Sequence, residues 1–280
     1  MKIIREMHMK ATQDGDGVAI SRVSDFSGLS LDPFLMVDEL KSDDEADYMG
    51  GFPPHPHRGL ETFTYMIKGG FEHRDQLGNK KKITAGNVQW MSTGFGVVHA
   101  EMPMVDTDGM HGFQIWVNMP AKDKLRPAIY ADSIEGGLPQ ISNLSGATLK
   151  ALAGTWQFAD QESADTAQSP IPALSGDASI ADVSLDSGGK AIIDRSAHNQ
   201  AFVYVHTGEV AGYSAGQLLL LDSAQPLELS SVNGGEALVF SGRKIGEKIA
   251  HYGPFVMNTM EEINQAITDY NAGKFGSIGA

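Results

Sequence analysis

The segment ETFTYMIKG at residues 61–69 comes back in altered form as QAFVYVHTG at residues 200–208. Both copies contain a Phe, a Tyr and a terminal Gly, and both are rich in the β-branched and aromatic residues that strands prefer. A second pair of similar segments follows in the same order, GNVQWMS at 86–92 and GQLLLLD at 216–222. Ordered similarity of this kind predicts two copies of one β-barrel along the chain.

The rest of the chain continues the strand pattern and contains one clear helix. Further segments bounded by turn residues are typical of strands, among them GFQIWVNM (112–119) and EALVFSG (236–242). The exception is NTMEEINQAITDYNAG (258–273), which begins with a capping box of Thr259 and Glu262 and has apolar residues at helical spacing, Ile263, Ala266, Ile267 and Tyr270. We therefore expect a mostly β fold with two barrels and a C-terminal α-helix that packs on the second barrel.

A stretch rich in Gly, Ser and Pro at 134–148 interrupts the strand pattern and is typical of a linker. It divides the chain into an N-terminal barrel (1–135), a linker (136–148), a C-terminal barrel (149–258) and the helix (259–273).

Composition excludes several classes of protein. The 280 residues carry 35 acidic and 21 basic side chains, a formal net charge of −14, and this field repels nucleic-acid phosphates. The one short lysine run, NKKK at 79–82, is typical of a solvated turn, so we expect no direct nucleic-acid partner. No apolar run reaches the length of a membrane span, the N-terminus lacks the pattern of a signal peptide, and there is no Cys. These features favour a cytoplasmic protein without membrane or disulfide chemistry.

Two pairs of metal-ligand residues lie in the N-terminal half. HPHRGLE (55–61) places His55 and His57 two apart, and HAE (99–101) places His99 and Glu101 at the same spacing. Residues two apart in a strand point to the same face, so two such strands of one barrel can aim all four side chains at one point. A single His-x-His pair also occurs as an ordinary surface or hydrogen-bonded pair. Two pairs at equal spacing favour a divalent transition metal, for which three imidazoles and a carboxylate are suitable ligands.

The second copy of the barrel acts as an internal control. The positions aligned with His55, His57, Glu61, His99 and Glu101 are Asp194, Ser196, Gln200, Leu229 and Ser231. The repeat keeps the apolar strand residues and loses every proposed ligand. Residues present in only one copy are not needed for the fold, so we expect one functional metal ion per chain, in the N-terminal barrel.

Four long segments resemble the signature segments of the pirin family, two-barrel members of the cupin superfamily. They are GGFPPHPHRGLETFTYMIKG (50–69), GNVQWMSTGFGVVHAEMP (86–103), GFQIWVNMP (112–120) and GRKIGEKIAHYGPFVMNT (242–259). The resemblance covers nearly the whole chain and implies two cupin (jelly-roll) β-barrel domains in tandem. It departs from the cupin motifs by one extra residue before Gly69, and by Ser92 and Thr93 at the place of the usual proline.

The resemblance also implies the roles of individual residues. In pirins the metal ligands are the two histidines of the first motif and the histidine and glutamate of HAE, which correspond to His55, His57, His99 and Glu101. Glu61 is a ligand in many other cupins, and we expect it here beside the metal centre, orienting a histidine ring. The metal implied is one divalent transition ion; we expect Fe(II), with Mn, Ni, Cu, Co or Zn as alternatives.

The activity implied is that of a quercetin 2,3-dioxygenase, which cleaves the heterocyclic ring of a flavonol with O2 and releases CO. Glu101 then either takes the proton of the flavonol hydroxyl or serves only as a fixed ligand. The alternative is a metal-dependent regulatory protein that binds a transcription factor or a metabolic enzyme. An isomerase or decarboxylase of the cupin superfamily would fit the metal site but not the pirin segments. We expect a flavonol-like molecule and O2 as partners, and a monomer.

Several side chains near the motifs are candidates for a substrate pocket. Phe52, Phe63, Trp90 and Met91 either line such a pocket or belong to the plain core, and Phe34 and Met36 are candidates for its mouth. His73 and His111 lie outside both ligand pairs, and we expect each to be exposed or hydrogen-bonded.

Overall fold

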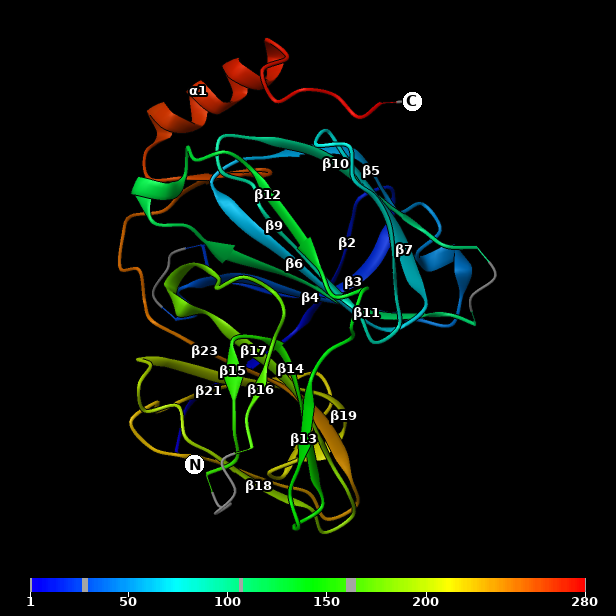
Figure 1. The fold of residues 1–280 in the computed structure, drawn as a ribbon, viewed down its shortest axis with the longest axis vertical. Coiled ribbons are helices and arrows are strands. Elements are labelled where there is room, and N and C mark those ends of the chain that lie inside the picture. The colour runs from blue at the N-terminus through cyan, green and yellow to red at the C-terminus, as the bar shows by residue number, and fades with distance from the viewer. Residues whose placement is uncertain (1, 27–29, 106–107, 160–164, 280) are drawn as a thin grey trace. The chain divides into compact units, whose positions relative to one another are not determined.

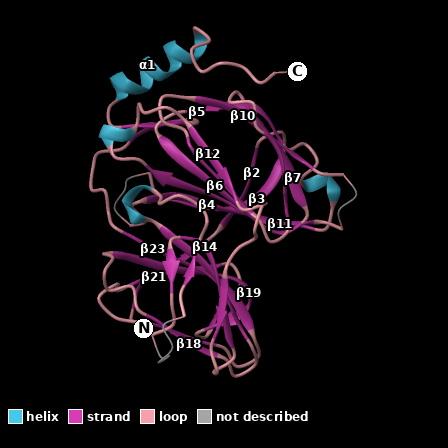
Figure 2. Cartoon of the chain, in the orientation of Figure 1, coloured by secondary structure: helices cyan, strands magenta, loops and turns pink. Residues whose placement is uncertain are grey.

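The computed structural model describes residues 2–26, 30–105, 108–159 and 165–279. The chain forms two compact units built almost entirely of strands, which confirms the predicted mostly β fold of two barrels (Figures 1 and 2). We call residues 10–29, 34–137 and 245–280 the first barrel. Residues 1–9, 30–33 and 138–244 are the second barrel.

The first barrel contains two antiparallel sheets. The larger sheet has the strand order β12 (Ile129–Asp132), β9 (Val88–Ser92), β6 (Leu60–Lys68), β11 (Met110–Asn118), β4 (Phe34–Ser42), β3 (Val18–Ser24) and β2 (Lys10–Asp14). The smaller sheet has the order β5 (Phe52–His57), β10 (Val97–Pro103), β7 (Gly70–Asp75) and β8 (Lys80–Thr84). A hairpin of β24 (Ala250–Tyr252) and β25 (Phe255–Met257) and two 3-10 helices, η1 (Glu45–Asp47) and η2 (Ala121–Asp123), complete it together with the C-terminal helix.

The second barrel is built on one main sheet. Its order is β1 (Ile3–His8), β21 (Gln217–Leu221), β19 (Gln200–Val210), β23 (Gly235–Gly242), β17 (Ser179–Leu185), β14 (Ala147–Ala153) and β13 (Gln140–Ser142), with β20 (Tyr213–Ser214) beside β19. Two short pairs accompany it, β15 (Thr155–Trp156) with β16 (Ala167–Gln168) and β18 (Lys190–Ile193) with β22 (Leu227–Ser230), and η3 (Ser175–Asp177) is its 3-10 helix.

The internal repeat predicted from the sequence has a structural counterpart. Strand β6 lies between β9 and β11, and its repeat partner β19 lies between β21 and β23. The matched aromatic residues are buried in both copies, Phe63 and Tyr65 in β6 and Phe202 and Tyr204 in β19. The segments that resemble each other thus occupy corresponding central positions in the two sheets.

Helix α1 (Met260–Asn271) begins at the predicted capping box: Thr259 Oγ1 accepts a hydrogen bond from the backbone N–H of Glu262 at 3.2 Å. We expected it to pack on the second barrel, and this expectation is wrong. Its buried residues Ile263 and Ala266 pack against Val98 of β10, with Phe255 and Phe275, all in the first barrel (Figure 1). The hairpin of β24 and β25, which precedes α1, explains this position. Its residue Phe255 pairs with Arg58 next to β5, so the chain enters the helix beside the smaller sheet of the first barrel.

The ends of the two units also differ from the predicted division. We placed residues 1–9 in the N-terminal barrel, but β1 pairs with β21, so this strand completes the second barrel. The predicted linker at 136–148 contains β13, which pairs with β14 and extends the same sheet. Neither pairing leaves a local signal, because each depends on a partner elsewhere in the chain. Within the part of the chain that the structure describes, no helix has the length and apolar character of a membrane span.

Candidate metal centre

The three histidines of the predicted ligand set lie on neighbouring strands of the smaller sheet. His55 and His57 belong to β5 and His99 to β10, and the Cα atoms of His55 and His99 are direct partners across the ladder. Their ring centroids are 4.4 to 5.0 Å apart. One ring nitrogen from each lies within 4.8 Å of the others, close enough for one ion to contact all three.

Each of these histidines has a nitrogen available for a metal. His55 Nδ1 lies 2.8 Å from the carbonyl oxygen of Pro53, and His57 Nδ1 lies 3.3 Å from that of Pro254. A carbonyl only accepts, so Nδ1 carries the proton in both rings and Nε2 keeps its lone pair. His99 is buried, and neither of its ring nitrogens has a hydrogen-bond partner among the described residues.

The environment also keeps the rings of His57 and His99 neutral. Burial, and then the nearby His55, lowers the pKa of His57 and of His99 well below the ordinary value. Neutral imidazole is the form that binds metals. The three side chains therefore fit a transition-metal ion in geometry, and His57 and His99 also fit it in protonation.

Glu101 has another environment in this structure. A β-bulge separates it from His99 in the pairing with β5, and its Oε1 accepts hydrogen bonds from Gln89 Nε2 and, at 3.1 Å, from Thr64 Oγ1. One carboxylate oxygen of Glu101 lies within 4.8 Å of a ring nitrogen of His99 and one of His73, in a second group that overlaps the first only at His99. The four predicted ligands therefore lie in two overlapping groups.

A cavity of about 550 Å³ opens beside the first group. His55, His57 and Glu101 line it, together with the predicted pocket residues Phe52 and Met36. Its walls include three further flat side chains, Phe26, Trp116 and His251, of which Phe26 and His251 stack with centroids 3.7 Å apart. Its polar wall contains Arg22, whose guanidinium makes two hydrogen bonds of 2.8 and 2.6 Å to Asp38.

The other predicted pocket residues lie elsewhere. Phe34, Phe63, Trp90 and Met91 are buried in the barrel and are not among the residues that line the cavity. Glu61 does not face the cavity: its Oε2 accepts from Trp90 Nε1 at 3.1 Å, and its Oε1 pairs with Arg126 at 3.2 Å. Strand alternation explains this, since Thr64 and Met66 of β6 line the cavity and Glu61 and Phe63 point to the opposite face.

Sequence reasoning missed several functional candidates. Thr64 and Gln89 bond Glu101, and Gln114, Trp116 and Arg22 line the cavity. The alternation within each strand predicts which residues share a face, but only the assembled barrel shows which face encloses the cavity. His73 and His111, expected to be exposed or hydrogen-bonded, are both buried, with Nε2 of each bonded to a carboxylate, Asp75 at 3.1 Å and Glu39 at 2.9 Å.

The second barrel differs from the first in its metal-ligand side chains. Among the described residues, both groups of three or more metal-ligand side chains within 4.8 Å belong to the first barrel. At the aligned positions, Leu229 is part of the second barrel's apolar core, and Asp194 accepts a hydrogen bond from the backbone N–H of Ser196 at 2.8 Å.

Comparison with known proteins finds similar sequences and similar structures over nearly the whole chain. Residues 19–117 match the family model described as Pirin, and residues 180–276 match the one described as Pirin C-terminal cupin domain. A Vibrio cholerae protein named "Putative quercetin 2,3-dioxygenase" is 42% identical over 268 residues, which cover 94% of each chain. A crystal structure of quercetin 2,3-dioxygenase from Acinetobacter baumannii superimposes with a TM-score of 0.82 at 30% identity, over 99% of both chains. A bacterial pirin from Escherichia coli in complex with nickel(II) shares the fold, with a TM-score of 0.58 at 19% identity, over 84% of this chain and 96% of that one.

Proposed function

This chain belongs to the pirin family, and from that premise we propose that it is a metal-dependent dioxygenase of the quercetin 2,3-dioxygenase type. One observation carries the proposal. Three imidazoles with available lone pairs converge beside a cavity whose walls include the flat side chains Phe26, Phe52 and Trp116. The cavity, at about 550 Å³, is within the range of sites that enclose small organic ligands.

We assign one divalent ion, Fe(II) in the cell, to His55, His57, His99 and Glu101. When bound, the ion supplies a Lewis-acid centre for the 3-hydroxyl and 4-carbonyl oxygens of a flavonol and supports its reaction with dioxygen. Glu101 joins the three histidines by turning away from Gln89 and Thr64, its partners in this structure.

The residues of the chain then have distinct tasks. Glu101 lines the cavity and, when its bond to the ion opens, takes the proton of the flavonol 3-hydroxyl. Phe26, Phe52 and Trp116 hold the planar rings and exclude water. The pair of Arg22 and Asp38 offers a donor and an acceptor to the outer hydroxyl groups of the substrate.

Oxygen isotopes test the reaction directly. Dioxygen adds across C2 and C4 of the flavonol, and C3 leaves as CO together with its own oxygen. Protein stripped of metal, reloaded with Fe(II) and given quercetin under ¹⁸O₂ should release unlabelled CO and form a depside that carries two labelled oxygens. Absence of CO and depside would reject the enzyme and leave the metal-dependent regulatory protein as the function to examine.

A substitution tests the ligand assignment. His57→Ala should lose most of the bound metal and all turnover, because three donors hold a divalent ion less firmly and with altered geometry. His206→Ala is the matched control: His206 is likewise buried, but it lies in the second barrel, where its Nε2 is 3.0 Å from Asp182. If His57→Ala kept both metal and turnover, the assignment would be wrong.

The choice of metal is tested by reloading. Affinity order favours Cu(II) and Ni(II) in vitro, so purified protein can carry either of them. Fe(II) should support turnover, and Zn(II), which has no redox chemistry, should not. Full turnover with Zn(II) and none with Fe(II) would refute the assignment of iron.

A further inference from the structure

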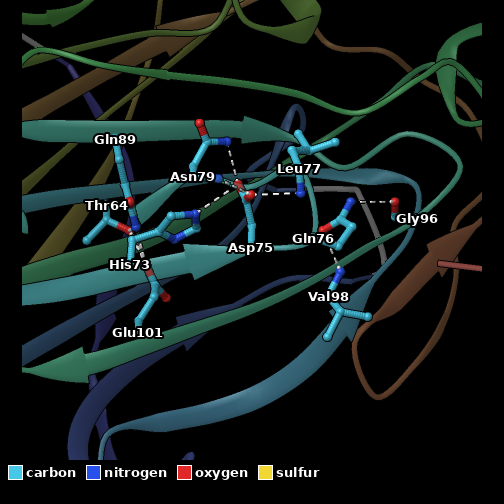
Figure 3. A network of polar contacts seen from close by, with 10 residues as sticks. All are labelled: Thr64, His73, Asp75, Gln76, Leu77, Asn79, Gln89, Gly96, Val98 and Glu101. Carbon is cyan, nitrogen blue, oxygen red and sulfur yellow. Dashed lines mark hydrogen bonds and ion pairs between the residues drawn. The ribbon is translucent and has the colours of Figure 1, made fainter. Parts of the chain in front are cut away.

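His73 of β7 lies directly beside Glu101, its Cα partner across the ladder to β10. The side chain is fully buried, and its ring stacks on Tyr130 with centroids 4.9 Å apart. Its Nε2 lies 3.1 Å from Asp75 Oδ2 (Figure 3). The ring is therefore held in one place and one orientation.

Asp75 is itself rigidly positioned. Its Oδ1 accepts from the backbone N–H groups of Leu77 and Asn79 at 2.9 and 3.0 Å, and its Oδ2 accepts from Asn79 Nδ2 at 2.8 Å. With its carboxylate accepting from Nε2–H, the neutral ring of His73 keeps its lone pair on Nδ1. A histidine that donates one N–H to a carboxylate and presents the other nitrogen is the common arrangement of a metal ligand.

Within the described part of the chain, His73 and His99 both carry ring nitrogens without a hydrogen-bond partner. Nδ1 of His73 is buried and has no hydrogen-bond partner among the described residues, and the same holds for both nitrogens of His99. One ligand atom from each of His73, His99 and Glu101 lies within 4.8 Å of the others. Buried lone pairs without a partner are costly, and a cation placed here would satisfy the nitrogens of His73 and His99. It would also pair with the carboxylate of Glu101, whose Oε1 accepts from Gln89 and Thr64 in this structure.

We propose that His73 is a metal ligand, and that His73, His99 and Glu101 form an inner position for the ion. This inference rests on the proposed metal centre and extends it, since the inner position shares His99 and Glu101 with the ligand set proposed above. Two imidazoles and one carboxylate with open positions are the ligand set of non-haem Fe(II) oxygenases. One carboxylate oxygen of Glu101 already lies within 4.8 Å of His73 and His99 in this structure, whereas Glu101 is not part of the group of His55 and His57.

One ion uses the two positions in turn, because neutral His99 offers a single lone pair. His55 and His57 line the cavity, whereas His73 and His99 are not among the lining residues. The inner position therefore holds the ion without the two cavity-side imidazoles. It stores the metal when His55 and His57 do not bind it.

Metal binding to full-length variants tests the proposal independently of turnover. The double variant His55→Ala/His57→Ala removes both cavity-side imidazoles and leaves the inner group intact. Titration calorimetry with Co(II) should find one weaker site in this variant. Adding His73→Ala should weaken that site by more than tenfold, whereas adding His206→Ala should leave it unchanged.

Two further measurements distinguish the loss of a metal ligand from misfolding of the variant. His73→Gln keeps an amide donor for Asp75 but lacks the imidazole ligand, and it should weaken Co(II) binding as much as His73→Ala. Pulsed EPR of the Cu(II)-loaded double variant should detect two coupled imidazoles, and one after His73→Gln. The proposal is overturned if the double variant binds no Co(II) while wild type does. It is also overturned if His73→Gln, made in the double variant, changes the affinity for Co(II) by less than twofold. Wild-type protein that binds no metal would instead reject the metal centre as a whole.

Discussion

Asp269 of α1 and Arg58 beside β5 form a buried ion pair that ties the C-terminal helix to the first barrel. Arg58 Nη1 lies 2.9 Å from Asp269 Oδ2, and the side chains are only 2% and 6% exposed. The guanidinium lies over the rings of Phe95 and Phe275, 4.3 and 4.7 Å from their centroids. Removal of the carboxylate would leave a buried positive charge without its partner.

The variant Asp269→Asn makes this change while keeping the shape of the side chain. Breaking one side of a buried ion pair costs about 3–5 kcal/mol. The amide oxygen of Asn still accepts one hydrogen bond, so we expect the lower end, about 3 kcal/mol. If this free energy is lost from the contact between α1 and the first barrel, the equilibrium constant for local opening of the helix rises about 150-fold.

Hydrogen exchange measured by mass spectrometry on peptides covering 260–271 reports that opening directly. Lys274→Gln is the matched control, because Lys274 Nζ lies 2.8 Å from the other oxygen of Asp269 but its side chain is 56% exposed. Loss of such an exposed pair costs at most about 1 kcal/mol, less than a tenfold change. Equal exchange in Asp269→Asn and Lys274→Gln would show that apolar contacts of the helix, not the ion pair, hold it in place.

Three further perturbations concern Asp269, the C-terminal segment and the second barrel. Hydrogen bonds from Lys274, then Gln265 and Arg58, lower the pKa of Asp269 to about 2 from its ordinary 3.8 in spite of burial, so its stabilising effect should be complete above about pH 4 and should be lost as the pH falls toward 2. Helix exchange followed across that range should show this loss in wild type and not in Asp269→Asn. Gly96→Ala places a Cβ 2.6 Å from the ring of Phe275, which should displace the C-terminal segment and cost about 1–3 kcal/mol in urea unfolding. Ser231→Ala removes a buried hydroxyl that has no partner among the described residues, so stability should stay equal or rise, with metal content unchanged.

The candidate metal centre shows how far side-chain positions could be predicted from the sequence. The spacing of His55 and His57, and the place of His99 in a second strand, predicted that their side chains would share one face, and the three rings do converge. Alternation along a strand is a local property, so it can be read from the chain. The position of Glu101 could not be read in this way, because the β-bulge after His99 shifts its register against β5.

His73 was beyond sequence reasoning for a related reason. The nearest predicted ligands, His57 and His99, are 16 and 26 positions away in the chain, and His73 reaches Glu101 only because β7 pairs with β10 on the side opposite β5. The pairing partners of a strand depend on the whole sheet. The sequence also offered no sign that Asp75, two residues later, would turn back to hold the ring.

By itself, the sequence determined the local elements: the strands and their repeat, the capped helix at Thr259, and the two pairs of metal-ligand residues at strand spacing, His55 with His57 and His99 with Glu101. These follow from side-chain chemistry and periodicity within ten or so residues. The tertiary structure alone decided which barrel receives α1, which barrel β1 completes, and which faces enclose the cavity. Each of these depends on contacts between residues that are far apart in the chain, such as Arg58 and Asp269. Such a contact contributes free energy only when both partners are in place, so it cannot be read from either segment alone.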